Sequence, residues 1–201
     1  MPTAFTDEEM KRIRGELISA GIRLSKELGL QKMSVEKLTS AVGIAKGSFY
    51  LFFDSKEDFI LEIANYAGAE TQKKLLQKLN GRKQMSAHEL MEFFNEYIHS
   101  ELDLMNGLTV DDFLWLKKHI TKQTLFDPVE QIQTARLWLS IIDDVRDGVD
   151  AGTFVNLLKC IYAIREHSDT MVRDSMENSI QILLRTIEIY ISGKGNIYDQ
   201  F

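Results

Sequence analysis

One segment near the N-terminal end holds the side chains whose types and spacing could bind a nucleic acid. Lys46, Gly47 and Ser48 follow one another, with Tyr50 two residues further on. The lysine offers a cation for phosphate, the glycine allows a close backbone approach, and the serine hydroxyl can reach a base edge or a phosphate. Tyr50 adds a phenol on the same face. Lys56 starts a later helix, whose positive N-terminal end also favours phosphate.

Two short helices joined by a glycine would position these side chains. Ser34 is an N-cap candidate for a helix of about eight residues, and Gly43 ends that helix because glycine tolerates positive φ. A second short helix is expected over 45–52, with Phe49 turned inward. This arrangement is typical of a helix-turn-helix, which presents the N-terminal half of its second helix to the major groove of DNA.

Apolar residues that recur at intervals of three and four predict helices along the rest of the chain. Thr6 and Glu9 form a capping box, and Gly29 ends the resulting helix at about residue 28. Prolines occur only at positions 2 and 128, so the main helix breaker is nearly absent. The expected fold class is therefore all-α, and the further helices span about 55–79, 86–105, 110–120, 128–149, 154–167 and 171–191.

The charge of the chain is unevenly distributed. The 201 residues carry a formal net charge of −6, yet residues 1–60 hold nine basic and nine acidic side chains. The remaining residues therefore carry the whole negative charge. A neutral N-terminal part permits DNA binding by that part alone, although a neutral segment is also the ordinary expectation for a globular protein.

The composition argues against several other classes of protein. The longest nearly apolar stretch, 157–164, is far too short to span a membrane, and the acidic N-terminus is unlike a signal peptide. A cytoplasmic protein is expected. The lone Cys160 and four scattered histidines predict no metal site, and no cofactor motif occurs. No catalytic arrangement is present, so an enzyme is not expected, and the acidic side chains of the body suit a solvated face.

Residues 14–60 resemble the N-terminal domain of TetR-family transcriptional regulators, over roughly the first third of the chain. Three positions depart from the family pattern: Thr39 where alanine is usual, Ala45 where serine is common, and Phe52 where histidine is frequent. The resemblance is carried by Arg14, Leu17, Ala20, Gly29, Ser34, Val35, Leu38, Gly43, Ile44, Lys46, Gly47, Phe49, Tyr50, Phe53, Ser55 and Lys56.

The resemblance implies a regulator with two domains. Residues 1–54 would form a three-helix DNA-binding domain, and residues 55–201 a helical body that binds a small-molecule ligand and forms a homodimer. Two helix-turn-helix motifs spaced by about 34–36 Å would read a palindromic operator in double-stranded DNA. The implied mechanism is repression that the ligand relieves. The candidate DNA-binding residues are Arg14, Ser34, Val35, Ala45, Lys46, Gly47, Ser48, Tyr50 and Lys56.

The expected body offers a candidate ligand site and a candidate dimer interface. Phe94, Trp115 and Trp138 lie on three different predicted helices and could converge on a cavity for a mostly apolar ligand, although aromatic residues also fill ordinary cores. In the last helix, Ile182 and Ile189 leave a second apolar side, which calls for a second neighbour. The residues predicted for the dimer interface are Met176, Ile180, Leu183, Leu184 and Ile187.

Two other functions remain open from the residues. A DNA-binding regulator without a small-molecule ligand would share the N-terminal pattern. A helical protein-interaction module would share the helical body but would not need the glycine-linked short helices.

Overall fold

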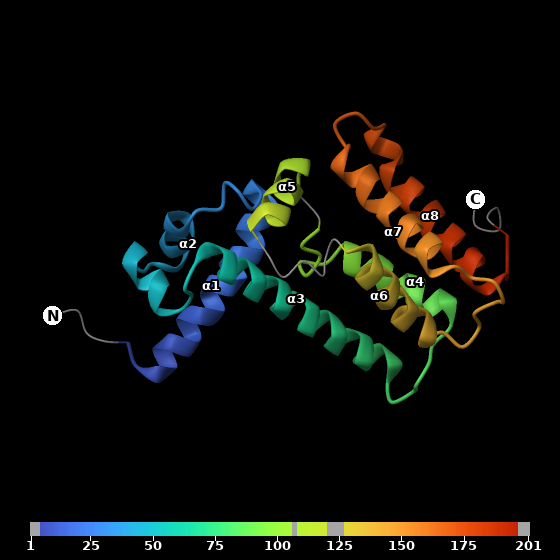
Figure 1. The fold of residues 1–201 in the computed structure, drawn as a ribbon, viewed down its shortest axis with the longest axis horizontal. Helices are drawn as coiled ribbons and strands as arrows, with labels where there is room; N and C mark the ends of the chain where they lie inside the picture. The colour runs from blue at the N-terminus through green and yellow to red at the C-terminus, as the bar shows by residue number, and fades with distance from the viewer. Residues whose placement is uncertain (1–4, 106–107, 120–126, 197–201) are drawn as a thin grey trace. The chain divides into compact units, whose positions relative to one another are not determined.

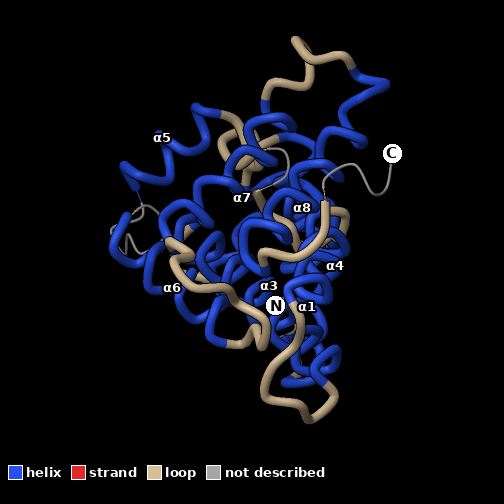
Figure 2. Tube along the Cα trace, turned by 90° about the vertical axis from the view of Figure 1, so that its right-hand side faces the viewer, coloured by secondary structure: helices blue, strands red, loops and turns tan. Residues whose placement is uncertain are grey.

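The computed structural model describes residues 5–105, 108–119 and 127–196, which form helices joined by loops and turns (Figure 1). No strand occurs in these ranges, as the colouring in Figure 2 shows, and the predicted all-α fold class is confirmed. The elements are α1 (Asp7–Leu28), α2 (Val35–Val42), the 3-10 helix η1 (Lys46–Leu51), α3 (Lys56–Leu79), α4 (Ala87–Ile98), α5 (Val110–His119), α6 (Pro128–Ser140), α7 (Ala151–Glu166), the 3-10 helix η3 (Arg173–Ser175) and α8 (Met176–Ser192).

The chain divides into two compact units. The first contains α1, α2, η1, the start of α3 as far as Glu70, and α5. The second contains the rest of α3 together with α4, α6, α7 and α8. The boundary between the units therefore lies within α3, whereas the sequence suggested a division after residue 54. Helix α5 belongs to the first unit although it lies far along the chain.

Local capping explains where the first two α-helices begin and end. The Thr6 side chain accepts a hydrogen bond from the Glu9 amide at 3.2 Å, and the Glu9 carboxylate accepts one from the Thr6 amide at 2.8 Å. Ser34 caps α2 by accepting from the Lys37 amide. Gly43 ends α2 in the left-handed region, at φ 73°. These features confirm the predicted starts of both helices.

An aromatic cluster holds η1 against the first unit. The ring of Phe49 is fully buried and lies 5.4 Å from that of Phe53 and 5.5 Å from that of Phe59, measured between ring centroids. Phe53 and Phe59 are 4.7 Å apart. The cluster joins η1 to the first turns of α3. Buried aromatic pairs of this kind fix the orientation of a short helix that is too small to be stable alone.

The core of the second unit lies between four helices. Helix α8 packs against both α4 and α7, and α6 packs against α7 (Figure 1). The largest fully buried side chains of this core include Leu90, Phe154, Ile161 and Ile187. They come from α4, α7 and α8, so the burial of apolar surface ties these three helices together.

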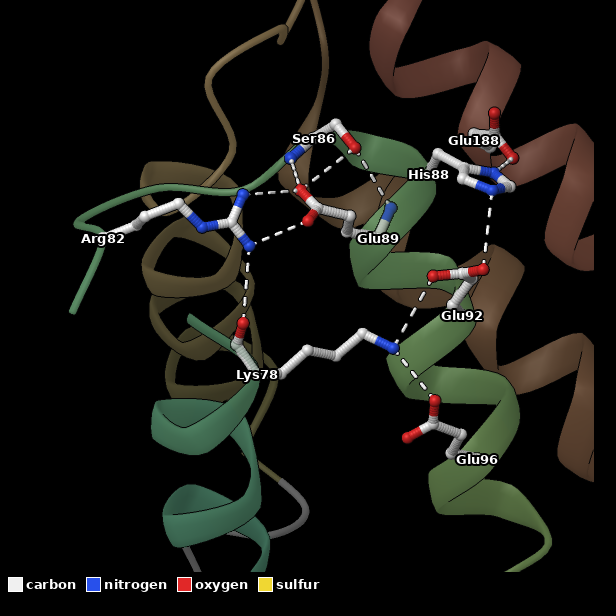
Figure 3. A network of polar contacts seen from close by, with 8 residues as sticks. All are labelled: Lys78, Arg82, Ser86, His88, Glu89, Glu92, Glu96 and Glu188. Carbon is white, nitrogen blue, oxygen red and sulfur yellow. Dashed lines mark hydrogen bonds and ion pairs between the residues drawn. The ribbon is translucent and has the colours of Figure 1, made fainter. Parts of the chain in front are cut away.

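A network of polar contacts joins α3, α4 and α8 at the surface of the second unit (Figure 3). The Arg82 guanidinium donates to both carboxylate oxygens of Glu89, at 2.8 and 3.2 Å. This bond, together with the backbone amide of the α4 N-cap, lowers the pKa of Glu89 to about 2. Lys78 reaches two further glutamates of α4. His88 lies 3.1 Å from the carboxylate of Glu188 on α8.

Two helices end earlier than the sequence predicted. Helix α4 ends at Ile98 rather than near 105, because the Ile98 carbonyl accepts a hydrogen bond from Arg165 at 2.6 Å. Helix α6 ends at Ser140 rather than near 149. The next residues form an isolated bridge with Met85, whose amide donates to the Ile141 carbonyl at 2.8 Å. Both corrections arise from contacts between residues far apart in the sequence.

Candidate functional site

The second helix of the helix-turn-helix is the 3-10 helix η1, not the α-helix expected over 45–52. Its bonds join residues three apart, as in the Ser48 amide donating to the Ala45 carbonyl at 2.9 Å. Ala45 precedes η1 and provides no side-chain cap. The buried Phe49 anchors the inner side of η1, as the sequence predicted. The other side faces outward.

The exposed side of η1 carries the residues that the sequence singled out. Ala45, Lys46 and Gly47 are exposed, and Ser48 is half-buried. Tyr50 is 56% exposed and its ring packs edge-on against Phe49, at 5.4 Å between centroids. One exposed apolar residue was not singled out, namely the neighbouring leucine at position 51, which is 61% exposed. Its place beside Tyr50 in the short helix was the available signal.

Gly47 is not required by the packing of the chain. Its φ does not lie in the left-handed region, and a Cβ added there would meet no atom within 4 Å. In contrast, a Cβ at Gly21 would lie 2.5 Å from a methyl group of Ile63 and 2.6 Å from the ring of Phe59. The glycine at 47 therefore leaves an open, flat place on the exposed side of η1.

The three candidate phosphate-binding cations differ in how strongly the chain holds them. Lys46 is 64% exposed at its side chain, and its ammonium lies 4.0 Å from the exposed carboxylate of Glu36. Arg14 is held more closely. Its guanidinium donates to the Glu62 carboxylate at 3.0 Å and lies over the Phe53 ring, 5.0 Å from the centroid. Lys46 is thus the more accessible cation of this pair.

Lys56 is also held by the first unit. Its ammonium donates to the Gln31 carbonyl at 3.2 Å and lies 5.1 Å from the centroid of the Trp115 ring. Partial burial lowers the pKa of this lysine. The side chain thus connects the start of α3 to the loop between α1 and α2 and to α5.

A carboxylate on α5 fastens the same loop, and the sequence analysis did not identify it. Asp112 is 2% exposed and accepts a hydrogen bond from the Gln31 amide at 3.1 Å. It also approaches Gly29 so closely that a Cβ there would lie 2.8 Å from its oxygen. Asp112 forms a capping box with Thr109 at the start of α5. The spacing of Thr109 and Asp112 could have revealed the cap, but not its contact with the loop.

The two candidates on α2 have structural roles in the chain. The Ser34 side chain caps the helix and is half-buried, and Val35 is half-buried in its first turn. Both can still border a DNA contact, because a helix N-terminus presents backbone amides that suit phosphate oxygens.

The second unit contains a cavity of about 390 Å³. Phe94 on α4 and Trp138 on α6 line it, 5.1 Å apart between ring centroids, and Phe154 on α7 adds a third ring. These positions agree with the sequence expectation for Phe94 and Trp138. The expectation for Trp115 is corrected, because α5 belongs to the first unit and the Trp115 ring lies over Lys56 and stacks on His119.

Most of the residues predicted for a dimer interface take part in the core of their own unit. Ile180, Leu184 and Ile187 are at most 4% exposed, so their side chains are already covered by α4 and α7. Met176 and Leu183 are half-buried. Ile182 and Ile189, also half-buried, are not among the core residues of the unit. They form the second apolar side of α8.

Metal-binding and membrane-spanning features were also sought. Across residues 5–105, 108–119 and 127–196, no group of three or more His, Cys, Asp or Glu side chains could hold a metal ion. No helix in these ranges is both long enough and apolar enough to cross a bilayer.

Comparisons with known proteins agree with this geometry. Residues 17–63 match the model of a family described as bacterial regulatory proteins, tetR family. No curated protein sequence matches the chain. A solved structure of reduced NemR from E. coli is 16% identical, with 92% of this chain and all of NemR covered, at a TM-score of 0.59.

A second solved structure is described as a molecular basis for the control of antibiotic production by bacterial hormones. It is 17% identical to the chain, with 90% of this chain and 97% of the other covered, again at a TM-score of 0.59. At such low identity these two structures show a shared fold. With the family match across α2, η1 and the start of α3, they show that the chain belongs to the tetR family of bacterial regulatory proteins.

Proposed function

We propose that the protein is a transcriptional repressor that binds a palindromic operator as a homodimer and releases it when a small, mostly apolar ligand binds. Regulators of this family bind DNA and small-molecule ligands and function as dimers. The finer points, namely repression, the palindrome and the nature of the ligand, are our inference from the residues described above.

The observation that carries the DNA-binding proposal is the exposed side of η1. Lys46 presents an accessible cation beside Gly47, where the chain itself places nothing within 4 Å of a Cβ. A glycine that packing does not require suits a site where the phosphate backbone of DNA comes close. Tyr50, more than half exposed, adds a hydroxyl on this side.

The cavity of the second unit supports the part of the proposal that concerns the ligand. Its volume of about 390 Å³ lies within the range of sites for small molecules, about 300–1,000 Å³. Three aromatic rings line it, which favours an apolar body. Coupling between the two sites must be reciprocal, so DNA should weaken ligand binding by the factor by which the ligand weakens DNA binding.

The experiment that tests DNA binding compares two glycine variants. We expect Gly47→Glu to reduce the affinity for DNA from upstream of the chain's own gene by about a hundredfold, because a carboxylate would face phosphates. Affinity is measured by gel shift at several salt concentrations, since contacts to phosphate weaken as salt rises. Gly68→Glu adds the same charge at an exposed site on α3 that also has no neighbours.

The two outcomes separate clearly. Unchanged DNA binding in Gly68→Glu, with both variants retaining the wild-type circular dichroism spectrum, would support an interface at η1. Equal binding by both variants, or wild-type binding that does not respond to salt, would contradict it.

A further inference from the structure

The cavity of the second unit has a polar place in an otherwise mostly apolar wall. Tyr162 on α7 lines the cavity. Its side chain also forms a hydrogen bond with Asp103, which is fully buried. The Asp103 carboxylate accepts a second hydrogen bond from the Arg165 guanidinium at 3.2 Å. A buried ion pair therefore lies directly behind one residue of the cavity wall.

This arrangement decides which half of the Tyr162 hydroxyl is available. Burial and the nearby Asp103 carboxylate raise the pKa of Tyr162, so the phenol stays protonated at neutral pH. A carboxylate can only accept, so the Tyr162 O–H donates to Asp103. The hydroxyl has no second proton to offer. Only its lone pairs remain for a molecule in the cavity.

The charged residues of the cavity wall oppose one another. Glu130 on α6 contributes a carboxylate and Lys159 on α7 an ammonium, and the latter donates to the Gln131 side chain at 2.7 Å. Asp103 and Arg165 likewise compensate each other. A ligand with a net charge would gain attraction to one of these groups and repulsion from the other. The wall therefore favours a neutral ligand.

We propose that the ligand is a neutral ring compound that carries a hydroxyl or N–H group, which donates a hydrogen bond to the Tyr162 hydroxyl while its ring packs on Phe94 and Trp138. This inference rests on the proposed function for the identity of the cavity as the ligand site. It adds the polarity of the ligand group that the cavity recognises.

The test uses two probes that differ in one hydrogen-bond donor. 1-Naphthol has a hydroxyl donor, and its methyl ether, 1-methoxynaphthalene, keeps the ring and an acceptor oxygen but lacks the donor. We expect wild-type protein to bind 1-naphthol about tenfold more tightly in isothermal titration calorimetry, the ratio that one net hydrogen bond produces. Tyr162→Phe should bind the two probes equally.

Tyr97→Phe is the matched control. Tyr97 is another partly buried tyrosine near Asp103, which together with burial raises its pKa to about 12, but it does not line the cavity. This variant should keep the tenfold preference for 1-naphthol. Thermal melting of both variants establishes that each is folded under the conditions of the titration.

Three results would overturn the inference: no binding of 1-naphthol by wild-type protein, equal binding of both probes, or a preference that survives in Tyr162→Phe. A gel shift without any probe separates this test from that of the proposed function. If wild-type protein does not bind DNA but shows the expected preference, the proposed function fails while the donor-reading cavity stands.

Discussion

At the scale of single residues, the accessibility of a cation decides whether it can reach phosphate. Arg14 and Lys56 hold positions that suit DNA contact, yet each is bound within its own unit, to Glu62 and to the Gln31 carbonyl. Releasing either would cost the hydrogen bond that it now makes. Lys46 faces only an exposed carboxylate 4.0 Å away, and an exposed pair of this kind contributes at most about 1 kcal/mol.

We therefore predict that Lys46→Ala weakens binding to all DNA sequences by a similar factor and lowers the slope of log affinity against log salt by about one. The reason is the loss of a single phosphate neutralisation. Lys83→Ala removes the same charge from an exposed position in the second unit and should leave the slope unchanged. A slope that is the same for wild-type protein and Lys46→Ala would contradict the assignment.

Gly21 illustrates a residue whose role is packing. A Cβ at this position would lie 2.5 Å from Ile63 and 2.6 Å from Phe59. We predict that Gly21→Ala lowers the free energy of unfolding by about 1–3 kcal/mol through overpacking, although alanine favours helices by up to about 1 kcal/mol. Gly15→Ala, in the same helix with no atom near its Cβ, should be neutral or stabilising in thermal melts. Similar melting temperatures for the two variants would refute the close crossing of α1 and α3.

At the scale of elements, the sequence predicted those helix ends that neighbouring residues determine. The Thr6 and Glu9 box and the glycine at 43 lie within or beside the helices that they delimit, so their signals are local. The end of α4 depends instead on Arg165, which is 67 residues away from Ile98 in the sequence. No pattern near Ile98 reports such a contact.

The cap of α4 also predicts how stability depends on pH. Because Arg82 and the N-cap amide lower the pKa of Glu89 from 4.5 to about 2, its ionised form stabilises the folded state at pH values above 4.5. That contribution should disappear as the pH falls from about 4.5 to about 2. We predict that Glu89→Gln loses less stability than wild-type protein over this range, as measured by urea unfolding at several pH values.

Glu96→Gln is the control for the pH experiment, because it removes an equally charged side chain that contacts Lys78 at the surface of the same helix. Its loss of stability on acidification should follow that of the wild type. If Glu89→Gln and wild-type protein lose stability in parallel, then the contact with Arg82 does not persist in solution.

At the scale of the whole molecule, sequence patterns identified much of the candidate site but not which compact unit each helix joins. Lys46, Gly47 and Tyr50 could be predicted because a short motif places them on one exposed helix side. Trp115 could not, since the apolar spacing of α5 is the same whether the helix joins the first or the second unit. Its position follows from long-range contacts such as that of Asp112 with Gln31.

The same distinction applies to the dimer interface. The apolar stripe of α8 at Ile180, Leu184 and Ile187 is buried within its own unit, so it cannot also cover a partner. The outer side of the helix retains Ile182 and Ile189, both half-buried and separate from the core. Two isoleucines seven residues apart lie on one side of a helix. We therefore place the proposed dimer contact on this outer side.

This placement leads to a prediction that separates assembly from folding. Ile182→Glu combined with Ile189→Glu should produce monomers in sedimentation velocity, because carboxylates cannot be buried in an apolar interface without a partner. The monomers should keep their helical circular dichroism signal and lose operator binding, since one helix-turn-helix reads only half of a palindrome. Val129→Glu with Leu137→Glu changes two exposed apolar residues of α6, 60% and 69% exposed, and should leave the dimer intact. A dimer that survives the α8 substitutions, or one that is lost through those on α6, would place the interface elsewhere.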